Sequence, residues 1–405
     1  MSNRYTIISA DCHAGGSHEQ YREFLDPAYR DDFDAWRAKY KTPFRDLQDG
    51  GRIRNWDDDV RNADLEAEGI VGEVVFPNTV PPFFPSFVLF VGPPQEKDYE
   101  HRLAGIRAHN RWMADFCSRF PERRAGLGQV FVNDVDDAIE DVRWCHENGL
   151  RGGVLLPNIA PDCDWVKPYI DACYDPLWAV CQDLGVPVTI HGGTGLPNHG
   201  PYPATALLYV NEATFYAQRP LVQFITSGVF ERFPDLKFVM TESGASWLPG
   251  VLENLDMVLD SVRETGRVGE LRFDDQHVLP RSATEYVRQN LYLGISQPTP
   301  ADLVVLDILG VDHVMWGADY PHKEGTAPFT REHLRQVFSD RPEDEVRGVL
   351  AGSAAELYGF DLAALAPIAE RVGPTVEEVA RPLTQLPDEP NEALVRSAKQ
   401  LAAAG

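Results

Sequence analysis

Six acidic or imidazole side chains occur where short apolar segments of the sequence end. Asp11 and His13 lie in "SADCHAGG", His191 in "TIHGGTG", Glu242 in "TESGAS", and Asp319 and His322 in "WGADYPHKEGT". Burying such groups without partners is costly. Carboxylate oxygens and imidazole nitrogens are, however, common ligands of divalent metals. The residue types therefore predict a metal centre, provided that the fold brings these side chains together.

Each of these residues also has an ordinary structural explanation. His191 could be a hydrogen-bonded core histidine, and Asp11 could cap a turn. Glu242 could cap the following helix, and His322 could cap a loop. Against this, Asp11 and His13 are two residues apart, so in an extended chain they point to the same side. Taken together, the residues favour one shared ligand set over separate structural roles.

Eight apolar, β-branched runs predict strands, and four of them contain one of these residues near their ends. They are "YTIISAD", "GEVVFPN", "RAGLGQVFV", "RGGVLLPN", "VPVTIHGG", "LKFVMTES", "LYLGIS" and "HVMWGAD". Longer helical patterns lie between them, and this alternation is typical of parallel strands joined by crossover helices. A doubly wound sheet shows the same alternation, but eight strands favour a (β/α)8 TIM barrel. In such a barrel all strands end at one mouth, where the six residues would meet.

Three segments do not fit the strand–helix repeat. Residues 14–60 predict a helical insertion after the first strand, within a barrel domain spanning residues 1–360. Residues 361–405 predict a C-terminal helical extension, because short helical patterns there are broken by prolines. The segment "NTVPPFFPSFVLFVGPP" is rich in Phe and Pro. Its Phe83, Phe84, Phe87 and Phe90 either pack in the core or form an apolar wall of a substrate pocket.

The composition excludes several classes of protein. The net charge of −25, with no cluster of Lys and Arg, argues against nucleic-acid binding. No apolar run is long enough for a signal peptide or a membrane span, so we expect a cytoplasmic protein with no membrane partner. The six cysteines form no C-x-x-C pair, which indicates reduced thiols. With 405 residues, 43% of them hydrophobic, the chain can bury a large core.

The segments "SADCH", "VTIHGGTG", "GVFERFPDLKFVMTESGASWLP" and "HVMWGADYPHKEGT" resemble the amidohydrolase-related (type 2) branch of the amidohydrolase superfamily. The resemblance extends from the first strand to about residue 360. It implies a distorted (β/α)8 barrel and a divalent metal bound by Asp11, His13, His191 and Asp319. Members of this branch include non-oxidative decarboxylases of aromatic acids and various hydrolases.

One position departs from the decarboxylase pattern. Those enzymes carry a histidine followed by glycines at the end of the sixth strand, where this chain has Glu242. A carboxylate normally stays ionised near pH 7 and favours metal binding over acid–base catalysis. We therefore expect Glu242 to bridge two ions. The predicted binuclear site comprises Asp11, His13, His191, Glu242, Asp319 and His322.

The motifs "DCHAGG", "TESGASW" and "ADYPHKEGT" are most similar to the nonheme diiron monooxygenases of platensimycin and platencin biosynthesis, which share this fold. That resemblance implies two Fe, O2 as co-substrate, an electron donor and an apolar diterpenoid or acyl-CoA substrate. Barrels of the amidohydrolase-related branch are often dimers, so we also expect a homodimer. We predict such a monooxygenase, with Asp319, Glu242 and His322 as catalytic residues. The alternative is a hydrolase or non-oxidative decarboxylase that uses one Zn or Mn ion.

Overall fold

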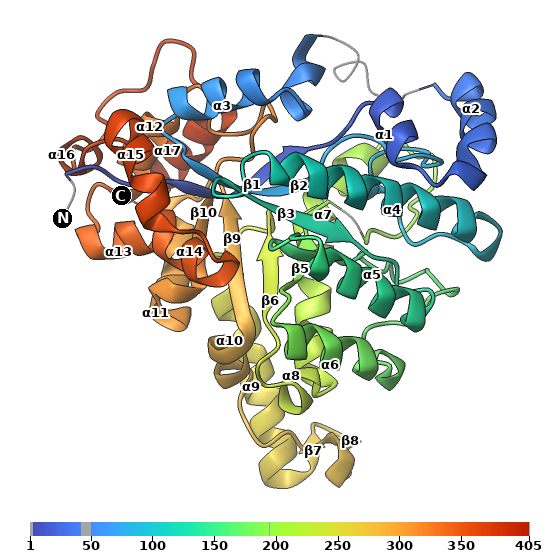
Figure 1. Ribbon diagram of the computed structural model, residues 1–405. Helices are drawn as coiled ribbons and strands as arrows, with labels where there is room; N and C mark the ends of the chain where they lie inside the picture. Colours follow the sequence, from blue (N-terminus) through green and yellow to red (C-terminus); the bar gives the residue numbers. More distant parts are fainter. Residues whose placement is uncertain (1–2, 42–49, 194, 405) are drawn as a thin grey trace.

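The computed structural model of the chain describes residues 3–41, 50–193 and 195–404 (Figure 1). Eight parallel strands form a nearly closed barrel in the order β1-β2-β3-β4-β5-β6-β9-β10. Their bounds are β1 Ile8–Ala14, β2 Gly72–Pro77, β3 Arg124–Gln129, β4 Gly153–Leu155, β5 Val188–His191, β6 Phe238–Thr241, β9 Leu291–Ser296 and β10 Val314–Gly317. Each overlaps one of the eight predicted runs. The (β/α)8 TIM-barrel prediction is confirmed.

The barrel closes between its last strand, β10, and its first, β1. Just beyond β10, the Asp319 N–H donates to the Asp11 carbonyl oxygen at 2.8 Å. Two residues further along β1, the His13 N–H donates to the carbonyl oxygen of Tyr320 at 2.6 Å. The pairing of β1 with β2 also shifts by one residue at this point, as in a β-bulge. The bonds that close the barrel therefore also bring Asp11 and His13 next to Asp319.

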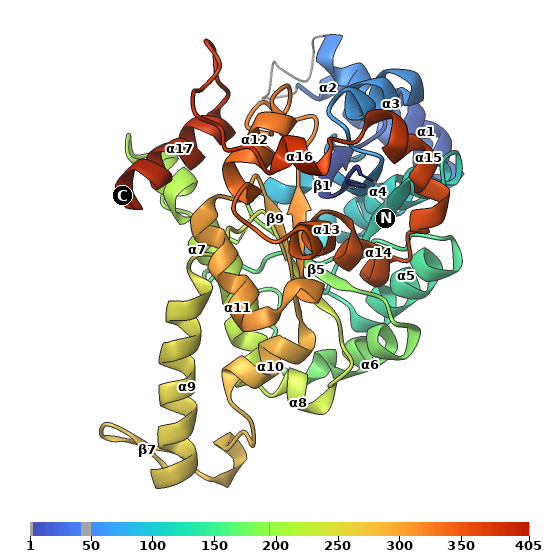
Figure 2. The ribbon, with the colours of Figure 1, turned by 90° about the vertical axis from the view of Figure 1, so that its left-hand side faces the viewer.

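Helices cover the outside of the barrel (Figures 1 and 2). They are α4 Glu96–Ser118, α5 Val135–Glu147, α6 Asp175–Leu184, α7 Thr205–Thr226, α8 Val229–Arg232, α9 Leu248–Thr265, α10 Ala283–Asn290, α11 Leu306–Leu309, α12 Thr330–Phe338, α13 Glu343–Arg347 and α14 Ser353–Tyr358. Their ends follow ordinary capping rules. Asp134 caps α5 by accepting from two backbone N–H groups, and Gly185 ends α6 in the left-handed conformation.

The helices α1 (His18–Phe24), α2 (Arg30–Lys39) and α3 (Asp58–Ala67) follow β1, where the insertion was predicted. Residues 42–49 of that prediction lie outside the described residues. Three helices follow residue 360: α15 (Leu362–Val372), α16 (Val376–Val379) and α17 (Glu392–Ala404). Helix α17 packs against α12 (Figure 2). The short hairpin β7 (Arg267–Val268) and β8 (Leu271–Arg272) projects with α9 at the opposite end from α1–α3 (Figure 1).

The barrel is filled by apolar side chains. One buried cluster occupies its interior and includes Ile8, Val74, Phe76, Leu127 and Met315, while a larger cluster fills the space between strands and helices. Each fully buried side chain of this kind contributes about 1.5–3 kcal/mol. Because the interior is packed, it leaves no channel, and a functional site belongs at the mouth where the strands end.

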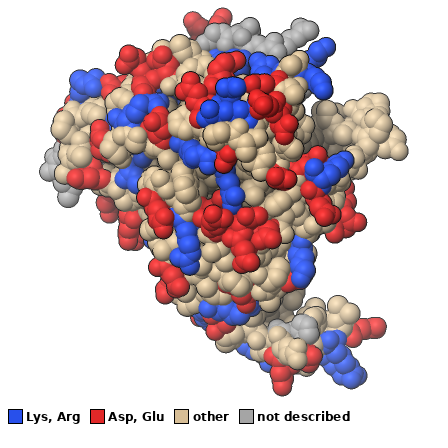
Figure 3. All heavy atoms as spheres, turned by 45° about the vertical axis from the view of Figure 1, so that its right-hand side comes forward, with Lys and Arg blue, Asp and Glu red and all other residues tan. Residues whose placement is uncertain are grey.

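The surface carries acidic and basic side chains side by side. The face in Figure 3 shows Lys and Arg interspersed with Asp and Glu, not gathered into a continuous basic patch.

None of the described helices combines the length and the apolar character needed to cross a membrane.

A buried ion pair supports the backbone near the barrel mouth. Arg61 on α3 is fully buried, and its guanidinium contacts both carboxylate oxygens of Glu73 on β2, at 2.5–3.0 Å. The same guanidinium donates to the carbonyl oxygen of His13 at 2.8 Å. This network joins the insertion to the strand that carries two predicted site residues.

We expect Arg61→Met to lower the free energy of unfolding by about 3–5 kcal/mol, because it leaves the Glu73 carboxylate buried with too little compensation. The measurement is chemical denaturation at pH 7. The control is Arg22→Met, which removes an exposed pair with Asp34 and should cost less than about 1 kcal/mol. Equal losses in the two variants would contradict a structural role for the buried pair.

Candidate metal centre

The ends of β1, β5, β6 and β10 bring the predicted site residues together. The His13 Nε2 atom lies 3.2 Å from Asp11 Oδ1 and 3.3 Å from Asp319 Oδ1. The His191 Nε2 atom lies 3.5 Å from Asp11 Oδ1 and 3.4 Å from Glu242 Oε2. Four of these side chains are buried, whereas 32% of the Glu242 side chain is exposed. Two overlapping groups have metal-binding geometry: Asp11, His13, His191 and Glu242; and His13, Asp319 and His322.

Three buried atoms at the centre of this cluster have no hydrogen-bond partner among the described residues: Asp11 Oδ1, His13 Nε2 and His191 Nε2. The opposite atom of each side chain is occupied. The second oxygen of Asp11 accepts from the Ser296 hydroxyl. The Nδ1 atoms of His13 and His191 face the carbonyl oxygens of Pro77 at 3.3 Å and Gly192 at 2.8 Å.

The protonation of the two imidazoles follows from these contacts. A carbonyl oxygen only accepts, so each Nδ1 carries a proton, and each Nε2 is the atom that can present a lone pair to a bound cation. Burial lowers the pKa of the His13 imidazole, but Asp11 and Asp319, whose oxygens lie 3.2 and 3.3 Å from its Nε2, raise that pKa well above its usual value. A divalent cation would displace the proton from His13 Nε2 and take the two Nε2 lone pairs and the Asp11 oxygen as ligands. The residues present therefore fit a metal.

The electrostatics of the cluster also favour a cation. Burial raises the pKa of Glu242 well above its usual range, and the negative charges of Asp319 and Asp11 raise it further. Burial opposes ionisation of Asp11 and Asp319, yet the neighbouring histidines lower the pKa of both carboxyls. The ionised carboxylates of Asp11 and Asp319 are thus held close to the carboxyl group of Glu242. A bound cation would relieve this repulsion directly.

The backbone around the cluster is strained at three strand ends. Glu242, Gln297 and Asp319 follow β6, β9 and β10, and their φ angles are 52°, 43° and 59°. Residues other than glycine adopt this left-handed region infrequently, and such conformations concentrate at functional sites. Gly192 shows how tight the mouth is, because a Cβ atom there would lie 2.2 Å from the carbonyl oxygen of Glu242.

His322 stands at the edge of the cluster, with 26% of its side chain exposed. Its Nδ1 lies 2.7 Å from Asp319 Oδ1, and its Nε2 lies 2.9 Å from Asn78 Oδ1. The Asn78 amide is itself oriented, because it donates to Asn55, which donates to the Arg52 carbonyl oxygen. His322 Nε2 is therefore a donor. Both nitrogens have hydrogen-bond partners, which distinguishes His322 from His13 and His191, whose Nε2 atoms have none among the described residues.

Sequence reasoning missed Gln297 and Arg396. The Gln297 amide donates to Asp319 Oδ2 at 2.7 Å, and its oxygen accepts from Arg396 on α17 at 2.5 Å. Gln297 directly follows the run "LYLGIS", so a search for every polar residue at the end of a predicted strand would have found it. A neutral amide carries no charge, so a search for carboxylate and imidazole ligands does not select it. No sequence pattern links Arg396 in the C-terminal extension to the barrel mouth.

A chamber of about 800 Å³ opens beside the cluster. Glu242, His322 and Gln297 lie on its wall, with Phe87, Leu89 and Tyr209 as apolar or aromatic neighbours and Arg54, Lys323 and Arg396 as basic ones. A cavity of this size suits a small organic molecule.

The Phe-rich segment has mixed roles. Phe87 lines the chamber, as one of the two interpretations predicted. Phe84 is fully buried and stacks on Phe131, and Phe83 packs against Phe33 of the insertion. The Phe90 side chain lies outside the described part of the structure. The apolar-wall interpretation therefore holds for Phe87 and not for Phe83 or Phe84.

The profile of the amidohydrolase family matches residues 11–360, so the chain belongs to that family. The 2-amino-3-carboxymuconate-6-semialdehyde decarboxylase of Dictyostelium discoideum is 25% identical over 312 residues, which is 76% of this chain and 77% of that protein.

Solved structures show the same fold. The 5-carboxyvanillate decarboxylase LigW of Sphingomonas paucimobilis is 20% identical, with a TM-score of 0.62 over 88% of this chain and 100% of that one. The dihydroxybenzoic acid decarboxylase of Polaromonas sp. JS666, solved with bound manganese and the inhibitor 2-nitroresorcinol, is 17% identical, with a TM-score of 0.60 over 88% of this chain and 97% of that one.

These findings correct the predicted activity. The relatives are decarboxylases, so the prediction of a nonheme diiron monooxygenase is wrong, and the alternative reading agrees better with the comparisons. The two Fe, O2, electron donor and acyl-CoA or diterpenoid substrate that accompanied it have no support. A divalent metal and a small-molecule substrate are supported. The error has a physical reason: carboxylate and imidazole ligands suit iron, manganese and zinc alike, so ligand type does not select the reaction.

We expect Gln297→Leu to weaken Mn²⁺ binding by about 10- to 100-fold, the usual effect of removing a hydrogen bond that orients a metal ligand. Isothermal titration of the metal-free protein with Mn²⁺ measures the change. Gln289→Leu, on the exposed surface of α10, is the control and should bind as the unaltered protein does. An unchanged affinity in a folded Gln297→Leu protein would show that this amide does not position Asp319.

Proposed function

We propose that this protein is a divalent-metal-dependent enzyme that decarboxylates a small aromatic or conjugated carboxylic acid without an oxidant. The observation that carries the proposal is the set of three unpartnered ligand atoms, on Asp11, His13 and His191, beside a chamber that admits a small organic acid. The decarboxylase relatives support the same class of reaction.

The residues that would hold the metal are Asp11, His13 and His191, with Glu242 and Asp319 completing the set. When bound, the divalent ion supplies a Lewis acid that orients the substrate and accepts negative charge. Ser296, which donates to Asp11, and the backbone carbonyls that accept from the two histidines fix the direction of the ligand atoms.

Loss of CO2 breaks a C–C bond and leaves its electron pair on the substrate carbon, so one proton must be delivered to that carbon. The pair His322 Nδ1 and Asp319 Oδ1, 2.7 Å apart, holds a proton at the edge of the cluster. Because a quarter of the His322 side chain is exposed in the chamber, the pair can take a new proton from solvent after each turnover. We assign His322 and Asp319 the role of proton donor.

The chamber fits an acid. Lys323 and Arg396 on its wall offer positive charge to the incoming carboxylate, and Phe87 and Tyr209 offer apolar and aromatic surface to a ring. Arg54 contributes less, because it is already paired with Asp64 at 2.7 Å.

One observation favours a second candidate, a metal-dependent hydrolase. Glu242 occupies the end of β6, where the resembling decarboxylases carry histidine, and its Oε2 lies 3.4 Å from His191 Nε2. A carboxylate at this place could accept the proton of an attacking water. The chemistry of the product separates the two candidates.

Protein loaded with Mn²⁺ should convert 2,6-dihydroxybenzoate or 5-carboxyvanillate to the arene that lacks the carboxylate, with one CO2 released per arene. The reaction should proceed equally well without oxygen, because no electrons leave the substrate. Liquid chromatography and CO2 measurement under anaerobic conditions provide the test, with metal-free protein as control. Failure on a wide panel of aromatic acids, with hydrolysis of esters or amides instead, would favour the second candidate.

Two variants separate the roles of His322 and Glu242. His322→Gln keeps a hydrogen-bond donor but no transferable proton, and should lower kcat by about 10²- to 10⁴-fold while the metal content stays the same. Glu242→Gln should lower the metal content itself, because it removes a ligand charge. Elemental analysis alongside steady-state kinetics measures both. Loss of metal from His322→Gln would make His322 a ligand and contradict its assignment as proton donor.

A further inference from the structure

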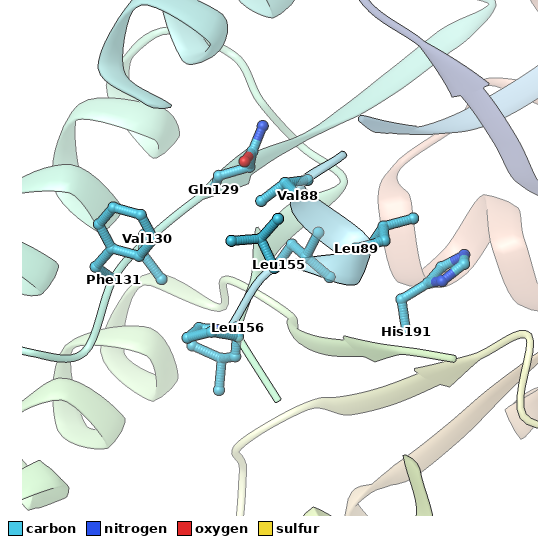
Figure 4. A pocket seen from close by; sticks show the side chains of 10 residues that line it. Val88, Leu89, Gln129, Val130, Phe131, Leu155, Leu156 and His191 are labelled. Carbon is cyan, nitrogen blue, oxygen red and sulfur yellow. The ribbon is translucent and has the colours of Figure 1, made fainter. Parts of the chain in front are cut away.

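A second, much smaller cavity lies behind His191 (Figure 4). Its volume is about 20 Å³, and the chain segments that line it are the ends of β3, β4 and β5 and the loop at residues 88–91. Figure 4 shows Gln129 and His191 on opposite sides of the apolar residues Val88, Leu89 and Leu155. A cavity of this size holds about one water-sized group. We call this cavity the Gln129 slot.

Gln129 is the polar residue of the slot that the metal centre does not use. Gln129 is 2% exposed, and both atoms of its side-chain amide, Oε1 and Nε2, have no hydrogen-bond partner among the described residues. Its backbone is fixed, because its N–H donates to the Asn110 amide oxygen and its carbonyl accepts from the Asn110 amide nitrogen, each at 2.8 Å. A buried donor and acceptor left unpaired cost stability, so their retention indicates a ligand.

Apart from His191, the other side chains that line the slot are apolar. Phe131, Leu155 and Leu156 are at most 5% exposed and form the walls with Val88 and Leu89. None of these side chains can stabilise a charge, so an ionised group in the slot would lose its hydration without compensation. The amide of Gln129, in contrast, can donate and accept at the same time, as a hydroxyl or carbonyl group requires.

The geometry links the slot to the metal centre. Gln129 pairs with Leu155 in the adjacent strand, and Leu155 pairs with Thr189, two residues before His191. Two interstrand spacings separate the backbones of β3 and β5 by about 10 Å, and Leu155 lies between them. Leu89 lines both the slot and the chamber, so the two cavities adjoin beside His191. A substrate whose ring lies in the chamber can therefore direct a small substituent past Leu89 into the slot.

We propose that the Gln129 slot is a substrate subsite, distinct from the metal centre, that takes an uncharged hydrogen-bonding substituent the size of a hydroxyl group. Gln129 is then a specificity-determining residue. This inference rests on the proposed function, because the molecule that enters the slot is the acid whose carboxylate reaches the metal centre. Sites with buried polar groups reject analogues that leave those groups unpaired.

The test is a binding measurement on Mn²⁺-loaded protein with three sets of probes: benzoate, the monohydroxybenzoates and the corresponding methylbenzoates. For the best-placed substituent, the unaltered protein should bind the hydroxyl compound at least tenfold more tightly than the methyl compound. In Gln129→Leu this preference should vanish or reverse. Gln289→Leu, which changes an exposed glutamine on α10, should keep the preference. A preference unchanged in Gln129→Leu, or no binding of any probe to the unaltered protein, overturns the proposal.

Thermal stability supplies an independent readout. Gln129→Leu should have a Tm equal to or above that of the unaltered protein, because it removes an unpartnered buried amide. A clear fall in Tm, repeated in Gln129→Met, would mean that the amide is structural and would overturn the proposal.

The binding test also separates this inference from the proposed function. Hydroxyl-dependent binding without CO2 release would leave the subsite standing and reject decarboxylation. Decarboxylation with equal binding of hydroxyl and methyl compounds would support the proposed function and reject the subsite.

Discussion

Repulsion between like charges is the constraint that organises this barrel mouth. Closure of β10 onto β1 joins the backbones of Asp319 and Asp11, so two carboxylates meet at the seam, and β6 adds Glu242. The Nε2 atoms of His13 and His191 point into the same space. A cation among these side chains would relieve the repulsion, because protein interiors solvate concentrated charge poorly. The repulsion between these carboxylates therefore lowers the stability of the seam between β10 and β1 and at the same time favours metal binding.

Further contacts around the cluster orient its members. Ser296 donates to one oxygen of Asp11, Gln297 to one oxygen of Asp319, and backbone carbonyls hold both imidazoles by their Nδ1 atoms. Each contact leaves the other atom of the ligand free to face the centre. The strained backbone at the ends of β6, β9 and β10 fits this view, because strain is retained where it directs a side chain to a required place.

Much of the fold and most of the cluster could be predicted from the sequence. Apolar runs that end in Asp, His or Glu predict the strands and also the residues at the barrel mouth, because the C-terminal ends of all barrel strands lie at that mouth. Contacts made by neutral amides could not be predicted this way: Gln297 and Gln129 carry no charge signature, and Arg396 arrives from a distant helix. The reaction was mispredicted because carboxylate and imidazole ligands suit several metals, so the residue types at the mouth do not distinguish oxygenation from decarboxylation.

Arg396 belongs to a segment beyond the family match at residue 360, yet it contacts the amide that touches Asp319. The common barrel thus provides the ligands, and an appended helix adjusts one of them through a single intervening side chain. Evolution can alter such an arrangement by exchanging tails, retuning the reactive centre of an old scaffold while every strand of the scaffold stays as it was.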